Sequence, residues 1–162
     1  MSNFLLSQMV AFMALLAGMA AAQFKTRQHI LQGWFVAAML AAVHFWLLGA
    51  IEACLLVSLT AMRFLVSSFT TNPRIMYLFL ALSFIAYVLT YNDPVSLLAL
   101  AATLTATVAS FQHDARRIRL IMMTAELFWL VHNTLIWSPV AIITEVLFFS
   151  SNTVALLRHS KE

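Results

Sequence analysis

The chain has few charged residues and only one cysteine. Of its 162 residues, 9% are charged and 63% are hydrophobic, whereas an ordinary soluble domain carries about 25% charged residues. So few charges cannot cover the surface of a water-soluble fold. The composition therefore predicts an integral membrane protein, with the lipid bilayer as a partner. The single cysteine, Cys54, excludes an internal disulfide and a metal site built from several cysteines.

Prolines and glycines are also scarce, with three of each in the chain. A bilayer core about 30 Å thick needs roughly 20 apolar residues of helix, and seven segments meet that need. Pro73, Pro94 and Pro139 lie at or near predicted helix starts, where a missing N–H costs little. The predicted spans cover about 4–24, 30–48, 51–70, 75–91, 94–111, 118–137 and 139–157.

The first span has the apolar core and small-residue tail of a signal peptide but lacks the basic leader. We therefore expect it to be an uncleaved first transmembrane helix. Short breaks separate the spans, at "FKTRQH", "GAIE", "TTNPR", "YNDP", "QHDARR" and "WSP". Such short connections make neighbouring helices antiparallel.

Positive charge is confined to alternate loops. The loops after the second, fourth and sixth spans contain no Lys or Arg. Because basic residues mark cytoplasmic loops, the pattern places the N-terminus outside and the C-terminus in the cytoplasm. It also explains the net positive charge without nucleic acid, which we do not expect as a partner. Eight of the nine basic residues lie on the predicted inner side: Lys25, Arg27, Arg74, Arg116, Arg117, Arg119, Arg158 and Lys161.

The two halves of the chain resemble each other at an offset of 88 residues, which pairs Ile30 with Ile118 and His44 with His132. Spans one to three then match spans five to seven in the same orientation, and span four inverts the chain between them. This layout predicts an all-α membrane protein with two parallel three-helix bundles joined by a linker helix. The expected segments are 1–70, 71–92 and 93–162.

Three helices, a linker and three more helices, with the N-terminus outside, resemble the SWEET and PQ-loop transporter superfamily. The basic loop before "HILQGWFVAAMLAAVHFWLLGAIEA" and the later "TAMRFLVSS" are similar to the YgjV-type bacterial inner-membrane proteins. The resemblance implies a multi-pass protein of the bacterial inner (plasma) membrane that works by alternating access. One departure is that no predicted span contains an interior proline, whereas SWEET transporters use such prolines as hinges.

Arg63 is the one basic residue deep inside a predicted span. It comes roughly 18 Å into its helix at 1.5 Å per residue, somewhat past the bilayer midplane. One interpretation is an arginine whose stem reaches toward the inner headgroups. The other is an anchor for an anion or carbonyl group in a central cavity.

Asn152 occupies nearly the equivalent position in the last span. The superfamily resemblance implies a polar pair from spans three and seven at the sugar site, here Arg63 with Asn152, which would shift preference toward an anionic solute. A helix–helix hydrogen bond is the structural alternative for Asn152. Glu126 and Glu145 also lie inside spans. Each is either protonated, and then able to couple movement to a proton gradient, or paired with Arg63.

His44 and His132 lie near the outer ends of their helices, where they either titrate as a symmetric pair or hydrogen-bond to the backbone. Trp129 and Asn133 lie on the same helix as His132, and Trp129 either stacks on a substrate ring or packs at the interface. The residues that we assign to substrate binding are Arg63, Asn152, Glu126, Trp129 and Asn133. Glu145 and the histidines are assigned to proton coupling or gating.

The sequence therefore predicts a SWEET-like transporter of a small polar solute, either a sugar or a small anionic metabolite. The alternative is a non-transporting inner-membrane scaffold or regulatory subunit with a structural Arg–Glu pair. A third class, an intramembrane enzyme built on Glu126, Glu145 and the two histidines, is the least favoured. Neither half has the HExxH spacing of a zinc hydrolase, and we expect no enzyme activity, cofactor or metal. Self-association into a homo-oligomer is left open.

Overall fold

The computed structural model describes residues 3–49, 51–91, 94–135 and 139–159. Within these ranges the chain forms seven helices and no strand, in agreement with the predicted all-α class. The predicted turns at 49–52, 91–94 and 137–139 fall partly on residues outside the described ranges. The helices are α1 (Asn3–Ala22), α2 (Arg27–Leu47), α3 (Ile51–Phe69), α4 (Pro73–Thr90), α5 (Ser96–Ser110), α6 (Ala115–Leu135) and α7 (Pro139–His159).

The helix starts follow local chemistry. Pro73 and Pro139 are the first residues of their helices, as predicted. Asn72 caps α4 by accepting a hydrogen bond from the backbone N–H of Arg74 at 2.9 Å. Such side-chain acceptors satisfy one of the N–H groups that a helix leaves without an internal partner.

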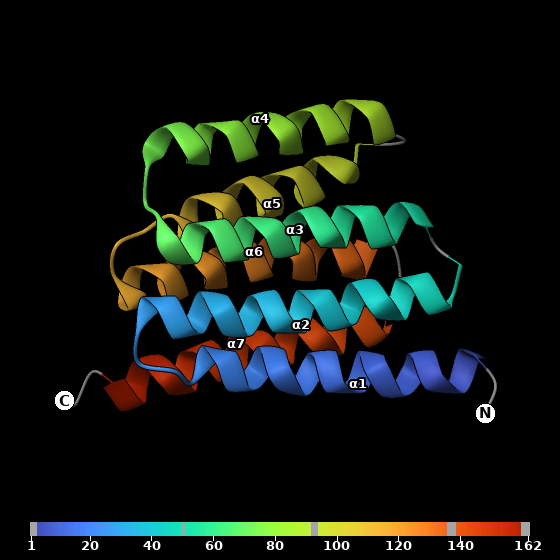
Figure 1. The fold of residues 1–162 in the computed structure, drawn as a ribbon, viewed down its shortest axis with the longest axis horizontal. Coiled ribbons are helices and arrows are strands. Elements are labelled where there is room, and N and C mark those ends of the chain that lie inside the picture. The colour runs from blue at the N-terminus through green and yellow to red at the C-terminus, as the bar shows by residue number, and fades with distance from the viewer. Residues whose placement is uncertain (1–2, 50, 92–93, 136–138, 160–162) are drawn as a thin grey trace. The chain divides into compact units, whose positions relative to one another are not determined.

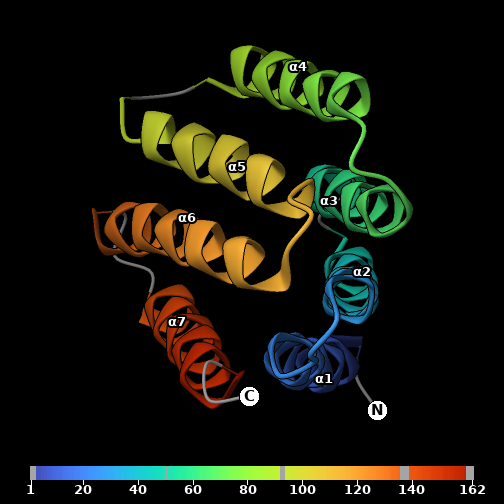
Figure 2. The same cartoon turned by 90° about the vertical axis from the view of Figure 1, so that its left-hand side faces the viewer.

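The chain divides into two compact units, Met1–Phe69 and Thr70–Glu162. In unit 1, α2 lies between α1 and α3 and contacts both (Figures 1 and 2). In unit 2, α6 contacts α5 and α7 in the same way, and α4 packs on α5 (Figure 2). The helix predicted as a linker thus groups with the second unit, while the three predicted segments of the chain stay a prediction.

Several local contacts recur at the predicted offset of 88 residues. Thr26 accepts a hydrogen bond from the N–H of His29, and Asp114 accepts one from the N–H of Arg117. The next bond recurs too, from Ile30 to the carbonyl of Thr26 and from Ile118 to that of Asp114, at 3.1 and 3.0 Å. α2 and α6 also have equal lengths of 21 residues. The offset found in the sequence therefore matches the local structure of both units.

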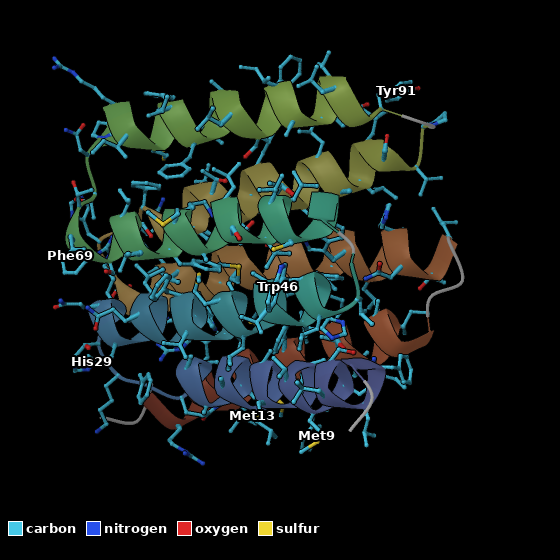
Figure 3. The ribbon with its side chains drawn as sticks, turned by 45° about the vertical axis from the view of Figure 1, so that its right-hand side comes forward. Met9, Met13, His29, Trp46, Phe69 and Tyr91 are labelled. Atoms are coloured by element: carbon cyan, nitrogen blue, oxygen red, sulfur yellow. The ribbon has the colours of Figure 1, made fainter. Side chains whose placement is uncertain are left out.

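Alanines make up more than half of the buried apolar residues, and many large apolar side chains face outward. In unit 1, Met9 and Met13 point away from α1 (Figure 3), and Leu89 of α4 in unit 2 is 79% exposed. Membrane helices pack through small residues in this way because lipid solvates large apolar side chains. The buried alanines are Ala14, Ala21, Ala22, Ala42, Ala61, Ala102, Ala106, Ala109, Ala125 and Ala155.

The closest approach recorded in unit 1 is between α1 and α2. A Cβ added to Gly33 would lie 2.5 Å from the Cβ of Ala21, a distance that real side chains do not reach. One residue on, the indole N–H of Trp34 donates to the carbonyl of Gly18 at 3.2 Å, and its ring contacts that of Phe64 on α3. The absence of a side chain at Gly33 therefore allows the two helices to pack this closely.

Three stretches within the described residues are long and apolar enough to cross a membrane by length and composition: Phe4–Ala22, Arg27–Leu47 and Ala141–Arg158. Three shorter apolar stretches, Cys54–Phe69, Pro73–Leu89 and Ser96–Ser110, belong to α3, α4 and α5. The remaining helix, α6, begins with a cluster of arginines that lowers its hydropathy.

Candidate functional site

The strongest polar contact inside a helix pair lies in unit 2, between α6 and α7. The Nδ2 amide of Asn152 donates a hydrogen bond of 2.7 Å to Oε1 of Glu126. Both side chains are buried, with 7% of Glu126 and 1% of Asn152 exposed. The other carboxyl oxygen, Oε2, and the amide oxygen of Asn152, Oδ1, are buried and have no hydrogen-bond partner. The pair thus presents two adjacent polar groups with acceptor capacity left over.

Two further predicted residues continue this polar face. Asn133 follows Glu126 by seven residues on α6, and Glu145 precedes Asn152 by seven on α7. Seven residues are two helical turns, so each pair shares one face of its helix. Asn133 is buried, Glu145 is half-buried, and Glu145 lies close enough to Glu126 to act on it electrostatically. Unit 2 therefore brings two carboxyl and two amide side chains to one helix pair.

Trp129 follows Glu126 by three residues on α6. It is half-buried, and its ring meets that of His132 edge to face, with centroids 5.5 Å apart. The recorded contact is within α6, between residues three apart. Substrate stacking on Trp129 stays a prediction.

His44 and His132 occupy equivalent positions in the two units and make equivalent bonds. The Nδ1 atom of His44 lies 2.8 Å from the carbonyl oxygen of Ser7, and that of His132 lies 3.1 Å from the carbonyl oxygen of Val95. Both pairs are separated by 37 residues. Each histidine joins the C-terminal part of its helix to the preceding helix or to the residue that caps its start, which agrees with the backbone-bonding interpretation. The proposed gating role is not tested by this contact.

Arg63 lies in α3 of unit 1 and is buried, with 5% exposed. Its guanidinium carbon is 5.0 Å from the centre of the Phe64 ring, a cation–π distance. Burial within unit 1 differs from the simplest picture of a side chain extended toward headgroups. The predicted partnership of Arg63 with Glu126 or Glu145 would join the two units and stays a prediction.

The sequence did not reveal the role of Arg27, which was assigned only to the charge of an inner loop. Its guanidinium donates to the carbonyl oxygens of Ser67 and Ser68, at 3.3 Å for Ser68. These carbonyls belong to the last turn of α3, where backbone acceptors have no partner within the helix. Arg27 thus joins the start of α2 to the end of α3. A basic residue near a predicted helix end was the one available signal.

In the described part of the chain, no group of three or more His, Cys, Asp or Glu side chains is arranged to hold a metal ion. The single cysteine, Cys54, is half-buried and carries a free thiol. The polar groups that are gathered in unit 2 can form hydrogen bonds and exchange protons.

Within the described residues, seven helices with many buried alanines, exposed large apolar side chains and a few buried polar groups define an all-helical membrane protein. The chain belongs to the family described as Imp-YgjV, bacterial inner membrane protein, whose family model matches residues 5–162. The predicted family is therefore confirmed, and so is a place in the bacterial inner membrane. No curated protein and no solved structure matches the chain.

Proposed function

We propose that the protein is a multi-pass inner-membrane transporter of a small polar solute. In this proposal all seven helices cross the membrane, as two parallel three-helix bundles with α4 as the connecting span. The N-terminus lies outside and the C-terminus in the cytoplasm. The recurring contacts at an offset of 88 residues support two bundles of like orientation, since a repeat in one orientation needs one extra crossing between its copies.

The observation that carries this proposal is the buried Glu126–Asn152 pair. A carboxyl group at membrane depth is costly, by roughly 2.5–3.5 kcal/mol on insertion scales. Glu126 lies near the middle of the 21-residue α6, far from either end. Ionisable groups at such positions usually mark a solute or ion pathway. A helix pair that needed only packing would be served as well by apolar side chains.

The chemistry of the pair favours a solute that carries hydroxyl or amino groups. Glu126 Oε2 and Asn152 Oδ1 are acceptors, and such donors would satisfy them. Of the two predicted solute classes, a sugar fits these atoms better than a small anion does. A solute that also carries an anionic group would be attracted to Arg63.

The first test is ligand-dependent stability. Purified protein in detergent is heated with sugars, amino acids, carboxylates and nucleosides, beside Asn152→Ala, Arg63→Ala and, as control, Thr124→Ala, whose hydroxyl bonds only within its own helix. A ligand in hundredfold excess over its Kd stabilises the native state by about 2.7 kcal/mol. We expect one class to stabilise wild type and the control but not Asn152→Ala.

Uptake of the same compound into proteoliposomes completes the test. Uptake by wild type and loss in Asn152→Ala supports transport. If no compound shifts the melting temperature and none enters vesicles, the scaffold or regulatory alternative replaces this proposal.

The orientation has its own test. In a Cys54→Ser background, Lys25→Cys and Leu48→Cys place single thiols in the loop after α1 and at the end of α2. A membrane-impermeant maleimide applied to cells with a permeabilised outer membrane should label Leu48→Cys, and Lys25→Cys only after lysis. The reverse pattern would contradict the orientation.

A further inference from the structure

The two oxygen atoms without a partner in the Glu126–Asn152 pair lie on groups already joined by one hydrogen bond. An acceptor buried without a donor costs roughly 1–3 kcal/mol, and native proteins rarely contain two such acceptors together. If the carboxyl is ionised, Glu126 cannot supply a donor to Oδ1 of Asn152, because a carboxylate only accepts hydrogen bonds.

One proton satisfies both atoms. A protonated carboxyl has one O–H donor, and a primary amide has both a donor and an acceptor. With the proton on Oε2 of Glu126, that O–H can donate to Oδ1 of Asn152, while Nδ2 of Asn152 donates to Oε1 as observed. The acid and the amide then form a closed ring of two hydrogen bonds.

We propose that Glu126 and Asn152 form a binding site for a single proton between α6 and α7. Binding converts the carboxylate to the acid and adds one hydrogen bond to the pair. Release returns the proton to water or to another base, breaks that bond and leaves a negative charge in the helix pair. The site exists whether or not a solute moves. Coupling of solute flux to this proton rests on the transport function proposed above.

The surrounding charges agree with a proton as the ligand. α5 contributes no ionisable side chain to the contact with α6. α7 contributes Glu145, whose negative charge opposes a second one on Glu126. On α6 itself, Arg119 and His132 lie seven residues before and six after Glu126, at least a helical turn and a half away. No cationic group in direct contact with Glu126 is recorded among the described residues.

Glu145 is the next group that can accept the proton. Asn133 lies seven residues after Glu126 on α6, and Glu145 lies seven residues before Asn152 on α7. A step forward on α6 is therefore matched by an equal step backward on α7. In an antiparallel pair this is one common register. The same acid and amide residue types therefore recur about 10.5 Å away, at 1.5 Å per residue.

Infrared spectroscopy of the protein in liposomes tests the site directly, because a protonated carboxyl has a C=O stretch that a carboxylate lacks. Spectra are recorded over a pH series for wild type, Glu126→Gln, Glu145→Gln and Asn152→Leu. We expect an acid band in wild type that disappears in Glu126→Gln and remains in Glu145→Gln. In Asn152→Leu the band should move to higher frequency, since the acid loses its hydrogen-bonded partner.

Three results would overturn the proposal. One is a wild-type spectrum with no acid band sensitive to Glu126→Gln at any pH where the protein is folded. Another is a band that disappears in Glu145→Gln instead. The third is a band seen in choline chloride and abolished by sodium chloride, which would make a sodium ion the ligand.

The wild-type spectrum needs no variant to fold, and circular dichroism identifies any variant that does not. The outcomes also separate this site from the proposed transport. An acid band without uptake of any solute retains the proton site and removes the transporter. Uptake without the band retains the transporter and removes the proton site.

Discussion

The two units share a set of local contacts but differ in their buried polar residues. Each has a capped middle helix, a histidine bonded to a backbone carbonyl 37 residues earlier, and a fully buried isoleucine, Ile30 or Ile118. The 88-residue offset places Glu126 on Ala38 and Asn152 on Phe64. Unit 1 is therefore apolar where unit 2 has a buried acid and amide. The helix caps and the histidine–carbonyl bonds therefore recur in both units, whereas the buried polar side chains differ.

The difference also runs the other way. Arg63 is buried in α3, and the offset places it on Ser151 of α7. Each of these buried polar groups thus occurs once and not at both equivalent positions. Arg63 is in unit 1, whereas Glu126 and Asn152 are in unit 2. This distribution suggests that packing constrains the shared positions and that function determines the unequal ones.

The largest effect is expected from making unit 2 resemble unit 1. Asn152→Phe removes the hydrogen bond that Asn152 donates to Glu126. We expect the free energy of unfolding to fall by about 3 kcal/mol, the upper end of the cost of an unsatisfied buried polar group. Adding Glu126→Ala copies the residues Ala38 and Phe64 and should restore most of the loss. Unfolding in detergent measures both. A double variant no more stable than the single one would contradict the equivalence of these positions.

A smaller effect is expected at the close helix contact in unit 1. Gly33→Ala places a methyl group 2.5 Å from the Cβ of Ala21, and such overpacking costs about 2 kcal/mol. The offset places Gly33 on Ile121, so this constraint belongs to unit 1 alone. Ala20→Leu, on the exposed face of α1, is the control and should leave the melting temperature unchanged. Equal melting temperatures for Gly33→Ala and wild type would show that α1 and α2 can move apart to accommodate the methyl group without loss of stability.

Arg27 provides a third difference, since the offset places it on Ala115. Arg27→Ala should lower the free energy of unfolding by about 1.5 kcal/mol, the lower end for hydrogen bonds that involve a charged group, because the side chain is only half-buried. Arg27→Lys keeps the charge but not the two-pronged contact and should recover part of the loss. If Arg27→Gln, with neither charge nor fork, were as stable as wild type, the contact would contribute nothing.

The smallest effect, and the sharpest comparison, concerns the histidines. His44→Ala and His132→Ala each remove one bond to a backbone carbonyl, worth about 1 kcal/mol. Because the contacts are equivalent, the two losses should agree closely, and the double variant should show their sum. Unequal losses of unfolding free energy would mean that the two hydrogen bonds, although equivalent in geometry, do not contribute equally to stability.

The helices could be predicted from the sequence to within a few residues. The predicted span at 139–157 and α7 at Pro139–His159 begin at the same residue, and α3 at Ile51–Phe69 matches the predicted 51–70. Apolar length and proline position determine these limits locally. The repeat was also readable, because equivalent residues such as His44 and His132 were retained.

The site was predicted only as a set of residues. Glu126 and Asn152 were both selected for their depth in the predicted spans. A helix–helix hydrogen bond was one alternative for Asn152, but its partner, Glu126, was not predicted. The pairing of Arg63 with Glu126 or Glu145 stays a prediction. The choice of partner depends on how α6 and α7 are rotated and aligned. Helices that are apolar on every side, with alanines rather than leucines in the interior, do not reveal that rotation in their sequence.

The unequal lengths of α1 and α5 have a consequence for the surrounding lipid. α1 begins at Asn3, which the offset places on residue 91, whereas α5 begins only at Ser96. The 15 residues of α5 rise about 22 Å, roughly 8 Å less than a typical hydrocarbon core. With both helices spanning as proposed, the bilayer has to thin at the outer end of α5 or let headgroups sink there. With the orientation proposed above, this local thinning shortens the distance from the periplasm to the middle of α6. It occurs only in unit 2, which contains Glu126.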